Sequence, residues 1–206
     1  MEKSGHSGFS LIELMVTLAV ASILVGVLAP NMRTYLLNNQ LSNGVNDMLH
    51  SIQVARTEAI KRQPAVGAGV VVCGTAAPTL ADAALTCDYA TFKGWFVFVD
   101  SNGNWQHDAA EPVIERHGLL DAGVTVKTDA NARIVSFGAS GFANPAGARV
   151  PMRTLVLCDS RGVKQTGTGS TARALFITVT GRARASQAWN DVNNVALPLV
   201  AGGSCP

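Results

Sequence analysis

A single carboxylate interrupts the most apolar part of this sequence. Glu13 lies in a run of 21 residues, from Phe9 to Ala29, that contains no other charged side chain. A helix of this length can cross the hydrocarbon core of a bilayer. Because a charge at membrane depth costs about 2.5–3.5 kcal/mol on insertion scales, Glu13 is a candidate for a functional role. Two ordinary alternatives are a plain membrane anchor and a secretory signal cleaved after Ala29, although a signal is shorter and should not carry a glutamate.

The distribution of charge suggests a second kind of chemistry. Residues 82–121 carry seven acidic side chains against two basic ones, whereas residues 149–206 carry seven basic side chains against two acidic ones. The net charge is only +2, so the chain is polarised rather than strongly basic. Such asymmetry indicates a polyanion as a partner. Six of the seven cations are arginine, which binds phosphate through a bidentate fork.

The segment "GRAR" is the sharpest part of this pattern. If residues 182–186 are extended, Arg182 and Arg184 project from one face about 6.6 Å apart, which is close to the phosphate spacing of a nucleic-acid strand. Gly181 would let the backbone approach, and the glycine-rich stretch before it would bring further cations to the same polyanion. We predict DNA binding by Arg182, Arg184, Arg173, Lys164 and Arg161. Such binding would be non-specific and steeply dependent on salt. The alternative is a solvated edge strand whose charges discourage aggregation.

An acidic loop offers a third candidate site, for calcium. Its oxygen-bearing side chains occupy positions 1, 3, 5, 9 and 12 of a calcium-binding loop, namely Asp100, Asn102, Asn104, Asp108 and Glu111. However, Trp105 stands where the sharp turn requires glycine, and a strand rather than a helix is expected before the loop. We therefore favour a polar loop in which these side chains bond their own backbone, and we predict no metal site.

Motifs of enzymes are absent from the sequence. There is no GxxxxGK, HExxH or GxSxG pattern, and the four histidines are scattered. The spacing of cysteine and histidine does not suggest zinc. We therefore expect no catalytic residue, no cofactor and no enzymatic activity.

The elements that position these residues change in character along the chain. An apolar stripe at helical spacing runs through Leu37, Leu41, Val45, Met48, Ile52, Ala55 and Ala59. It predicts an amphipathic helix that lasts to about Arg62 and ends before Pro64. After Pro64, short β-rich runs alternate with Gly, Asn, Asp and Pro clusters, and no second long helix is expected. The prediction is an α+β fold with a long N-terminal helix packed on an antiparallel β domain.

The N-terminal segment "GFSLIELMVTLAVASILVGVLAP" resembles the leader and first helix of type IV pilins and pseudopilins. The resemblance implies that a prepilin peptidase cleaves after Gly8 and methylates Phe9, the new N-terminus. It also implies that Glu13 is the assembly carboxylate, and a buried carboxylate needs a partner. The freed ammonium of Phe9, in the same or a neighbouring subunit, would supply that partner. Pro30 matches the proline that bends this helix in the family.

Three later segments narrow the resemblance to minor pilins and pseudopilins of the GspH/FimT type. They are "SIQVARTEAIKRQ", "GWFVFVDSNGNWQHDAAEPVI" and "ITVTGRARAS". The resemblance implies an inner-membrane protein of a Gram-negative bacterium, with a periplasmic C-terminal domain, that joins other pilin subunits in a filament. One hypothesis is a type IV pilus minor pilin that binds DNA and serves its uptake in natural transformation. The alternative is a structural minor pilin or type II secretion pseudopilin that primes assembly without binding DNA.

The predicted organisation has four parts. They are a leader peptide at 1–8, a transmembrane and filament-core helix at 9–29, an amphipathic helix at 30–62 and a periplasmic β domain at 63–206. The even number of cysteines in an exported domain indicates two disulfides. Three pairings are possible, and we favour the pairs that are nearest in sequence, Cys73–Cys87 and Cys158–Cys205.

Overall fold

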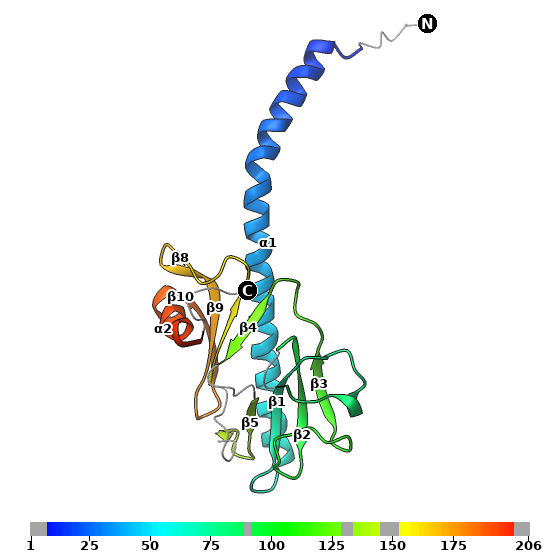
Figure 1. Ribbon diagram of the computed structural model, residues 1–206, viewed down its shortest axis with the longest axis vertical. Helices are drawn as coiled ribbons and strands as arrows, with labels where there is room; N and C mark the ends of the chain where they lie inside the picture. Colours follow the sequence, from blue (N-terminus) through cyan, green and yellow to red (C-terminus); the bar gives the residue numbers. More distant parts are fainter. Residues whose placement is uncertain (1–7, 89–91, 129–133, 145–152, 200–206) are drawn as a thin grey trace, which may run out of the picture. The chain divides into compact units, whose positions relative to one another are not determined.

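The computed structural model describes residues 8–88, 92–128, 134–144 and 153–199. Its first element is a helix of 52 residues, α1 (Leu11–Arg62), which continues through residue 30 without a break (Figure 1). The chain divides into two units, residues 1–39 and residues 40–206, and α1 contributes to both. We describe each unit separately.

The first unit holds the apolar part of α1. Within the described residues, α1 is the one helix that is long and apolar enough to cross a membrane, with a mean hydropathy of 2.5 in its most apolar window. None of that window is buried inside the protein, and Phe9 and Ile23 are each about 70% exposed. An apolar helix that finds no cover within its own chain requires a bilayer or other subunits to cover it.

The second unit adds two antiparallel sheets to the C-terminal part of α1 (Figure 1). One sheet has the order β3-β2-β1-β5-β6, and the other has the order β10-β9-β7-β4, with β8 paired to β9. Their bounds are β1 (Gly69–Thr75), β2 (Gly94–Asp100), β3 (Val113–His117), β4 (Thr125–Thr128), β5 (Ile134–Phe137), β6 (Ala143–Asn144), β7 (Thr154–Cys158), β8 (Gln165–Thr166), β9 (Gly169–Ile177) and β10 (Ala183–Ala188). A short 3-10 helix, η1 (Asp82–Ala84), lies between β1 and β2.

A continuous apolar core joins α1 to both sheets. The predicted stripe of α1 is buried from its second member onward, at Leu41, Val45, Met48, Ile52, Ala55 and Ala59. It packs against Val72 and Val97 of the first sheet and Leu155 and Leu175 of the second. The helix ends at Arg62, as Pro64 predicts, so the expected α+β architecture is confirmed.

A second helix, α2 (Trp189–Leu199), of 11 residues follows β10, although the sequence after Pro64 showed no second helical stripe of useful length. Its sequence, "WNDVNNVALPL", is rich in asparagine and contains a proline, so its intrinsic helix propensity is low. Tertiary packing outweighs that propensity. Val192 is fully buried and packs with Val156, Ala172 and Ala174 on the face of the second sheet opposite to α1.

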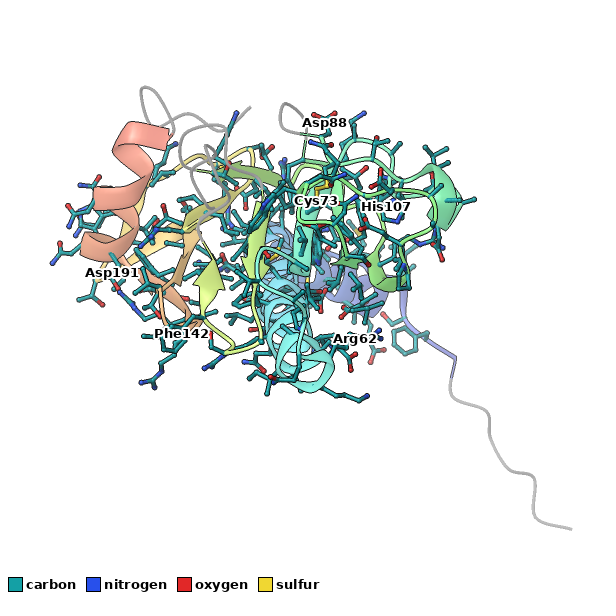
Figure 2. All side chains as sticks on the ribbon, turned by 90° about the horizontal axis from the view of Figure 1, so that it is seen from below. Arg62, Cys73, Asp88, His107, Phe142 and Asp191 are labelled. Atoms are coloured by element: carbon teal, nitrogen blue, oxygen red, sulfur yellow. A yellow bond between two sulfur atoms is a disulfide. The ribbon has the colours of Figure 1, made fainter. Side chains whose placement is uncertain are left out.

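A disulfide closes the outer face of the first sheet. It joins Cys73 of β1 to Cys87, as predicted, and appears as the yellow bond beside the label of Cys73 in Figure 2. Both cysteines pack with Leu85, Phe96 and Phe98 in a cluster separate from the central core. The second predicted disulfide pairs Cys158 with Cys205; Cys158 is disulfide-bonded, and Cys205 lies outside the described residues.

Candidate functional site

The first candidate site is the beginning of α1. Ser10 precedes the helix, and its Oγ accepts a hydrogen bond of 3.2 Å from the backbone N–H of Ile12. Ser10 is therefore the N-cap residue, and Glu13 occupies the third helical position. Ser-x-x-Glu at these positions is the capping-box pattern, in which the glutamate can reach back toward the N-cap backbone. The sequence itself contains this signal, which is independent of the membrane depth of Glu13.

The geometry of this first turn suits a pairing between Glu13 and a free amine at Phe9. Phe9 is the residue directly before the N-cap, so an amine generated there lies one residue from the backbone group that a capping glutamate approaches. A negative charge in the first turn is also favoured by the helix dipole. The side chain of Glu13 is exposed, so it is available to a neighbouring chain as well.

The second candidate site is the set of five predicted DNA-binding cations, which the structure does not bring together. Lys164 lies opposite Thr171 near the start of β9, and its backbone is bonded to that residue. Arg182 lies opposite Thr178, beyond the other end of β9. At about 3.3 Å per residue, these two positions are roughly 23 Å apart along the strand.

Two of the five predicted cations, both of them arginines, are committed to contacts inside the protein. The guanidinium of Arg161 donates three hydrogen bonds of 2.6–3.0 Å to the buried carboxylate of Asp159. Arg173 is only 9% exposed, and its Nη1 donates to the backbone carbonyls of Ser170 and Ala172 at 3.0 and 3.2 Å. The structure therefore removes Arg173 from the predicted DNA surface, because its side chain turns into the protein toward α1.

The "GRAR" segment is exposed, although one arginine is already paired. Arg182, directly before the edge strand β10, and Arg184, within that strand, are both exposed. Arg184 Nη1 donates to Asp191 of α2 at 2.9 Å, and its guanidinium lies 4.3 Å from the centre of the Phe176 ring. The pKa of Asp191 is lowered by a hydrogen bond from Ser186 and by this arginine. The charge of Arg184 is thus partly neutralised by its own chain.

Gly181 serves packing rather than approach to a ligand. It is buried, has a φ of +76° and faces Gly141, which also has a positive φ. A Cβ added to Gly181 would come within 2.2 Å of the Gly141 carbonyl oxygen. The expectation that Gly181 opens the backbone to a polyanion is therefore wrong, because this glycine lets two hairpins from different sheets meet.

The acidic loop adopts the self-bonded arrangement that the non-metal alternative predicts. Asp100 is fully buried, and its two carboxylate oxygens accept the N–H groups of Gly103 and Trp105 at 2.8 and 3.1 Å. Glu111 accepts the N–H groups of Ser101 and Asp108 at 2.7 and 3.1 Å. Across the described ranges, no group of three or more His, Cys, Asp or Glu side chains is placed to hold a metal ion.

Comparison with known families assigns the class of protein. Residues 44–181 match the family described as type II transport protein GspH, and residues 3–29 match the prokaryotic N-terminal methylation motif. Comparison with curated protein sequences gives no match. The chain belongs to the GspH family, whose members are structural and non-enzymatic pilins and pseudopilins.

The solved structures that resemble this chain include two crystal forms of the type IV minor pilin FimU from Pseudomonas aeruginosa strain PAO1. They are 22% and 20% identical to this chain, with TM-scores of 0.49 and 0.46. The alignments cover 73% and 72% of this chain and 96% and 99% of the FimU chains.

Family membership sets the general role of the protein. It is a minor pilin or pseudopilin of a type IV pilus or a type II secretion system. The methylation motif implies processing by a prepilin peptidase and assembly with other pilins. The single N-terminal apolar helix places the protein in the inner membrane, and in the filament once it is assembled.

Proposed function

We propose that this protein is a structural subunit that primes filament assembly, with Glu13 as its assembly carboxylate. The observation that carries the proposal is one carboxylate in the first turn of α1, whose most apolar stretch is not buried inside the protein. In a lone subunit that charge is costly at membrane depth. In an assembly it can be paired, so the cost is relieved only when subunits dock in register.

The pairing that we propose depends on processing of the leader. Cleavage after Gly8 would expose the amine of Phe9 next to the capped first turn of α1, and methylation would leave that amine able to carry a positive charge. An ammonium and a carboxylate in a site without water attract each other strongly. The pair would therefore favour the one axial position at which Phe9 of one subunit meets Glu13 of the same or the next subunit.

The test is the substitution Glu13→Val in the full chain, in cells that carry the other subunits. Wild-type protein should begin at N-methylated Phe9 by mass spectrometry. The variant should insert in the membrane at least as well, because the desolvation cost disappears. Its amount in sheared filaments should fall about tenfold or more, which corresponds to about 1.4 kcal/mol of lost docking energy.

The matched control is Ile12→Val, which places the same side chain one position earlier and should leave assembly unchanged. Normal incorporation of Glu13→Val would overturn the ion-pair proposal. A wild-type N-terminus after Ala29 would instead establish a cleaved secretory signal.

A second proposed function is non-specific contact with DNA during its uptake. It is supported by the exposure of Arg182 directly before the edge strand β10, of Arg184 within that strand and of Lys164 beside β8. Only these three of the five predicted cations remain candidates for such contact. A surface with so few cations should neutralise few phosphates, so its binding should be weak and sensitive to salt.

A gel shift with the full chain in detergent tests this second function. Wild type should shift duplex DNA at micromolar concentration or above in low salt, and Arg182→Ala/Arg184→Ala should lose most of that shift for unrelated sequences alike. Arg116→Ala, in the acidic segment, is the control and should change little. If the double variant bound DNA as well as wild type does, the DNA-binding proposal would be overturned and only the structural role would remain.

A further inference from the structure

Arg173 is a buried cation for which the filament role just proposed has no use. It lies in β9 between Ala172 and Ala174, on the face that turns toward α1 together with Leu175. Only 9% of the residue is exposed. Since a buried charge is costly unless it is paired and hydrogen-bonded, the partners of this guanidinium matter.

A gap in the pairing of β9 with β10 explains the two hydrogen bonds that Nη1 of Arg173 donates. β10 pairs with β9 up to Ser186↔Ala174, and the next recorded pair is Ala188↔Gly169. The β9 residues 170–173 therefore have no recorded partner in β10. Nη1 of Arg173 donates to the carbonyls of Ser170 and Ala172 within this gap, so the arginine satisfies two backbone groups that the irregular pairing leaves open.

The other nitrogens of the guanidinium, Nε and Nη2, are available as hydrogen-bond donors. Within the described part of the chain, every recorded hydrogen bond of this side chain uses Nη1, which leaves Nε and Nη2. The acidic neighbour, Asp159, is occupied by the three guanidinium bonds of Arg161. Burial lowers the pKa of Arg173 and the charge of Arg161 lowers it further, although the charge of Asp159 raises it. Two arginines and one aspartate leave one positive charge uncompensated.

Arg173 lines a pocket between α1 and the second sheet. The pocket has a volume of about 240 Å³ and is bounded by Ser42 and Asn46 of α1, Arg173 of β9, and Ser186 and Gln187 of β10. Its walls are mostly small or polar and offer hydroxyl and amide groups as additional hydrogen-bond partners. This volume admits one side chain and is too small for the backbone of a nucleic-acid strand.

We propose that this pocket, which we call the Arg173 pocket, binds a single carboxylate supplied in the filament by an acidic side chain of an adjoining subunit. One uncompensated positive charge calls for one negative charge. The planar fork of a guanidinium matches a carboxylate in geometry. The part that names the adjoining subunit rests on the proposed filament role, whereas the carboxylate chemistry rests on the pocket alone.

The carboxylate chemistry is tested with acetate as the probe. ¹⁵N-labelled full chain in detergent micelles is titrated with sodium acetate, against sodium chloride at equal ionic strength. The Nε–H resonance of Arg173, assigned by its loss in Arg173→Lys, should shift and saturate in the millimolar range with acetate only. The exposed Arg184 provides an internal control and should show no saturating shift.

Ser42→Phe separates binding from folding. The added ring fills the pocket mouth without removing any contact of Arg173, so the amide spectrum should stay dispersed while the acetate response disappears. The matched control, Gln53→Phe, places the same ring at an exposed position of α1 and should retain the response. An Arg173 shift no larger than that of Arg184, or one that survives Ser42→Phe, would overturn the carboxylate site.

The source of the carboxylate is tested by assembly in cells that carry the other subunits. Ser42→Phe should lower the amount of this protein in sheared filaments about tenfold, and Gln53→Phe should not. Wild-type incorporation of Ser42→Phe, with its acetate response lost, would overturn the adjoining-subunit assignment. Normal assembly of Glu13→Val would overturn the ion-pair proposal instead, and the acetate titration would still decide whether the pocket binds a carboxylate.

Discussion

Asp100 and Arg173 are two buried charges, one in each sheet, and their surroundings differ. Asp100 ends β2, and its loop folds back so that both of its carboxylate oxygens accept backbone N–H groups. Arg173 lies within β9, satisfies two carbonyls with one nitrogen and lines a pocket. A buried charge saturated by its own backbone indicates structure, whereas one with spare donors at a cavity indicates a place for a ligand.

The largest expected effect is the loss of stability when Arg161 is removed. It tests whether Asp159 is bound by Arg161 and is therefore not available to Arg173. Arg161→Ala leaves the Asp159 carboxylate, which is 1% exposed, buried without its partner. Removing one member of a buried ion pair costs about 3–5 kcal/mol, measured as the free energy of unfolding by chemical denaturation. Arg184→Ala should cost far less, because Arg184 and Asp191 are both exposed to solvent. Equal losses of stability for Arg161→Ala and Arg184→Ala would mean that Asp159 is not held by Arg161. The contrast drawn between Asp100 and Arg173 would then be wrong.

The next effect concerns the saturated carboxylate itself. Asp100→Ala removes the acceptor of two backbone N–H groups, and each unsatisfied donor costs about 1–3 kcal/mol. We therefore expect a loss of about 2–4 kcal/mol in the same measurement. Asp108→Ala, in the same loop but exposed, should cost about 0.5 kcal/mol or less. A loss for Asp100→Ala as small as that of the control would contradict a structural role for this carboxylate.

The smallest effect is a dependence on pH. Burial raises the pKa of Asp100 above its ordinary value of 3.8, and the charge of Glu111 adds to this although backbone N–H groups oppose it. The folded state therefore binds this proton more tightly than the unfolded chain does. The contribution of Asp100 to stability is full below pH 3.8 and declines as the pH rises through the raised folded pKa.

Asp100→Asn removes this titration. The free energy of unfolding of wild type minus that of the variant should therefore be larger at pH 3 than at pH 7, by a fraction of the Asp100→Ala loss. Denaturation curves across this range give the difference. A difference that grows with rising pH would show that the N–H groups, and not burial, dominate the environment of Asp100.

The parts of the fold that follow local rules were predictable from the sequence. The stripe from Leu41 to Ala59 and the stop before Pro64 define α1, and runs such as "WFVFV" define the central strands. Helix α2 was not predictable, because its asparagines are weak helix formers and burial of Val192 against the sheet stabilises it. The contrast between α1 and α2 shows that elements with a periodic apolar pattern can be predicted from the sequence. Elements that are stabilised by tertiary contacts cannot.

The candidate sites divide in the same way. The position of Glu13 was visible because an isolated charge in an apolar run needs no tertiary information. The burial of Arg173 was not visible, because it depends on a gap in the pairing of β9 with β10, and strand register is a long-range property. Arg161 and Arg184 were predicted as free cations for the same reason, since their partners are defined only once the chain has folded.

The contact between Gly181 and Gly141 has a consequence for evolution. Selection against any side chain at Gly181 would follow from the collision with the Gly141 carbonyl and from the positive φ, whatever the segment binds. Invariance of this glycine among relatives would then record a steric constraint on two hairpins. It would carry no information about DNA, whereas exchange of Arg182, which the fold does not require, would reveal whether its charge is under selection.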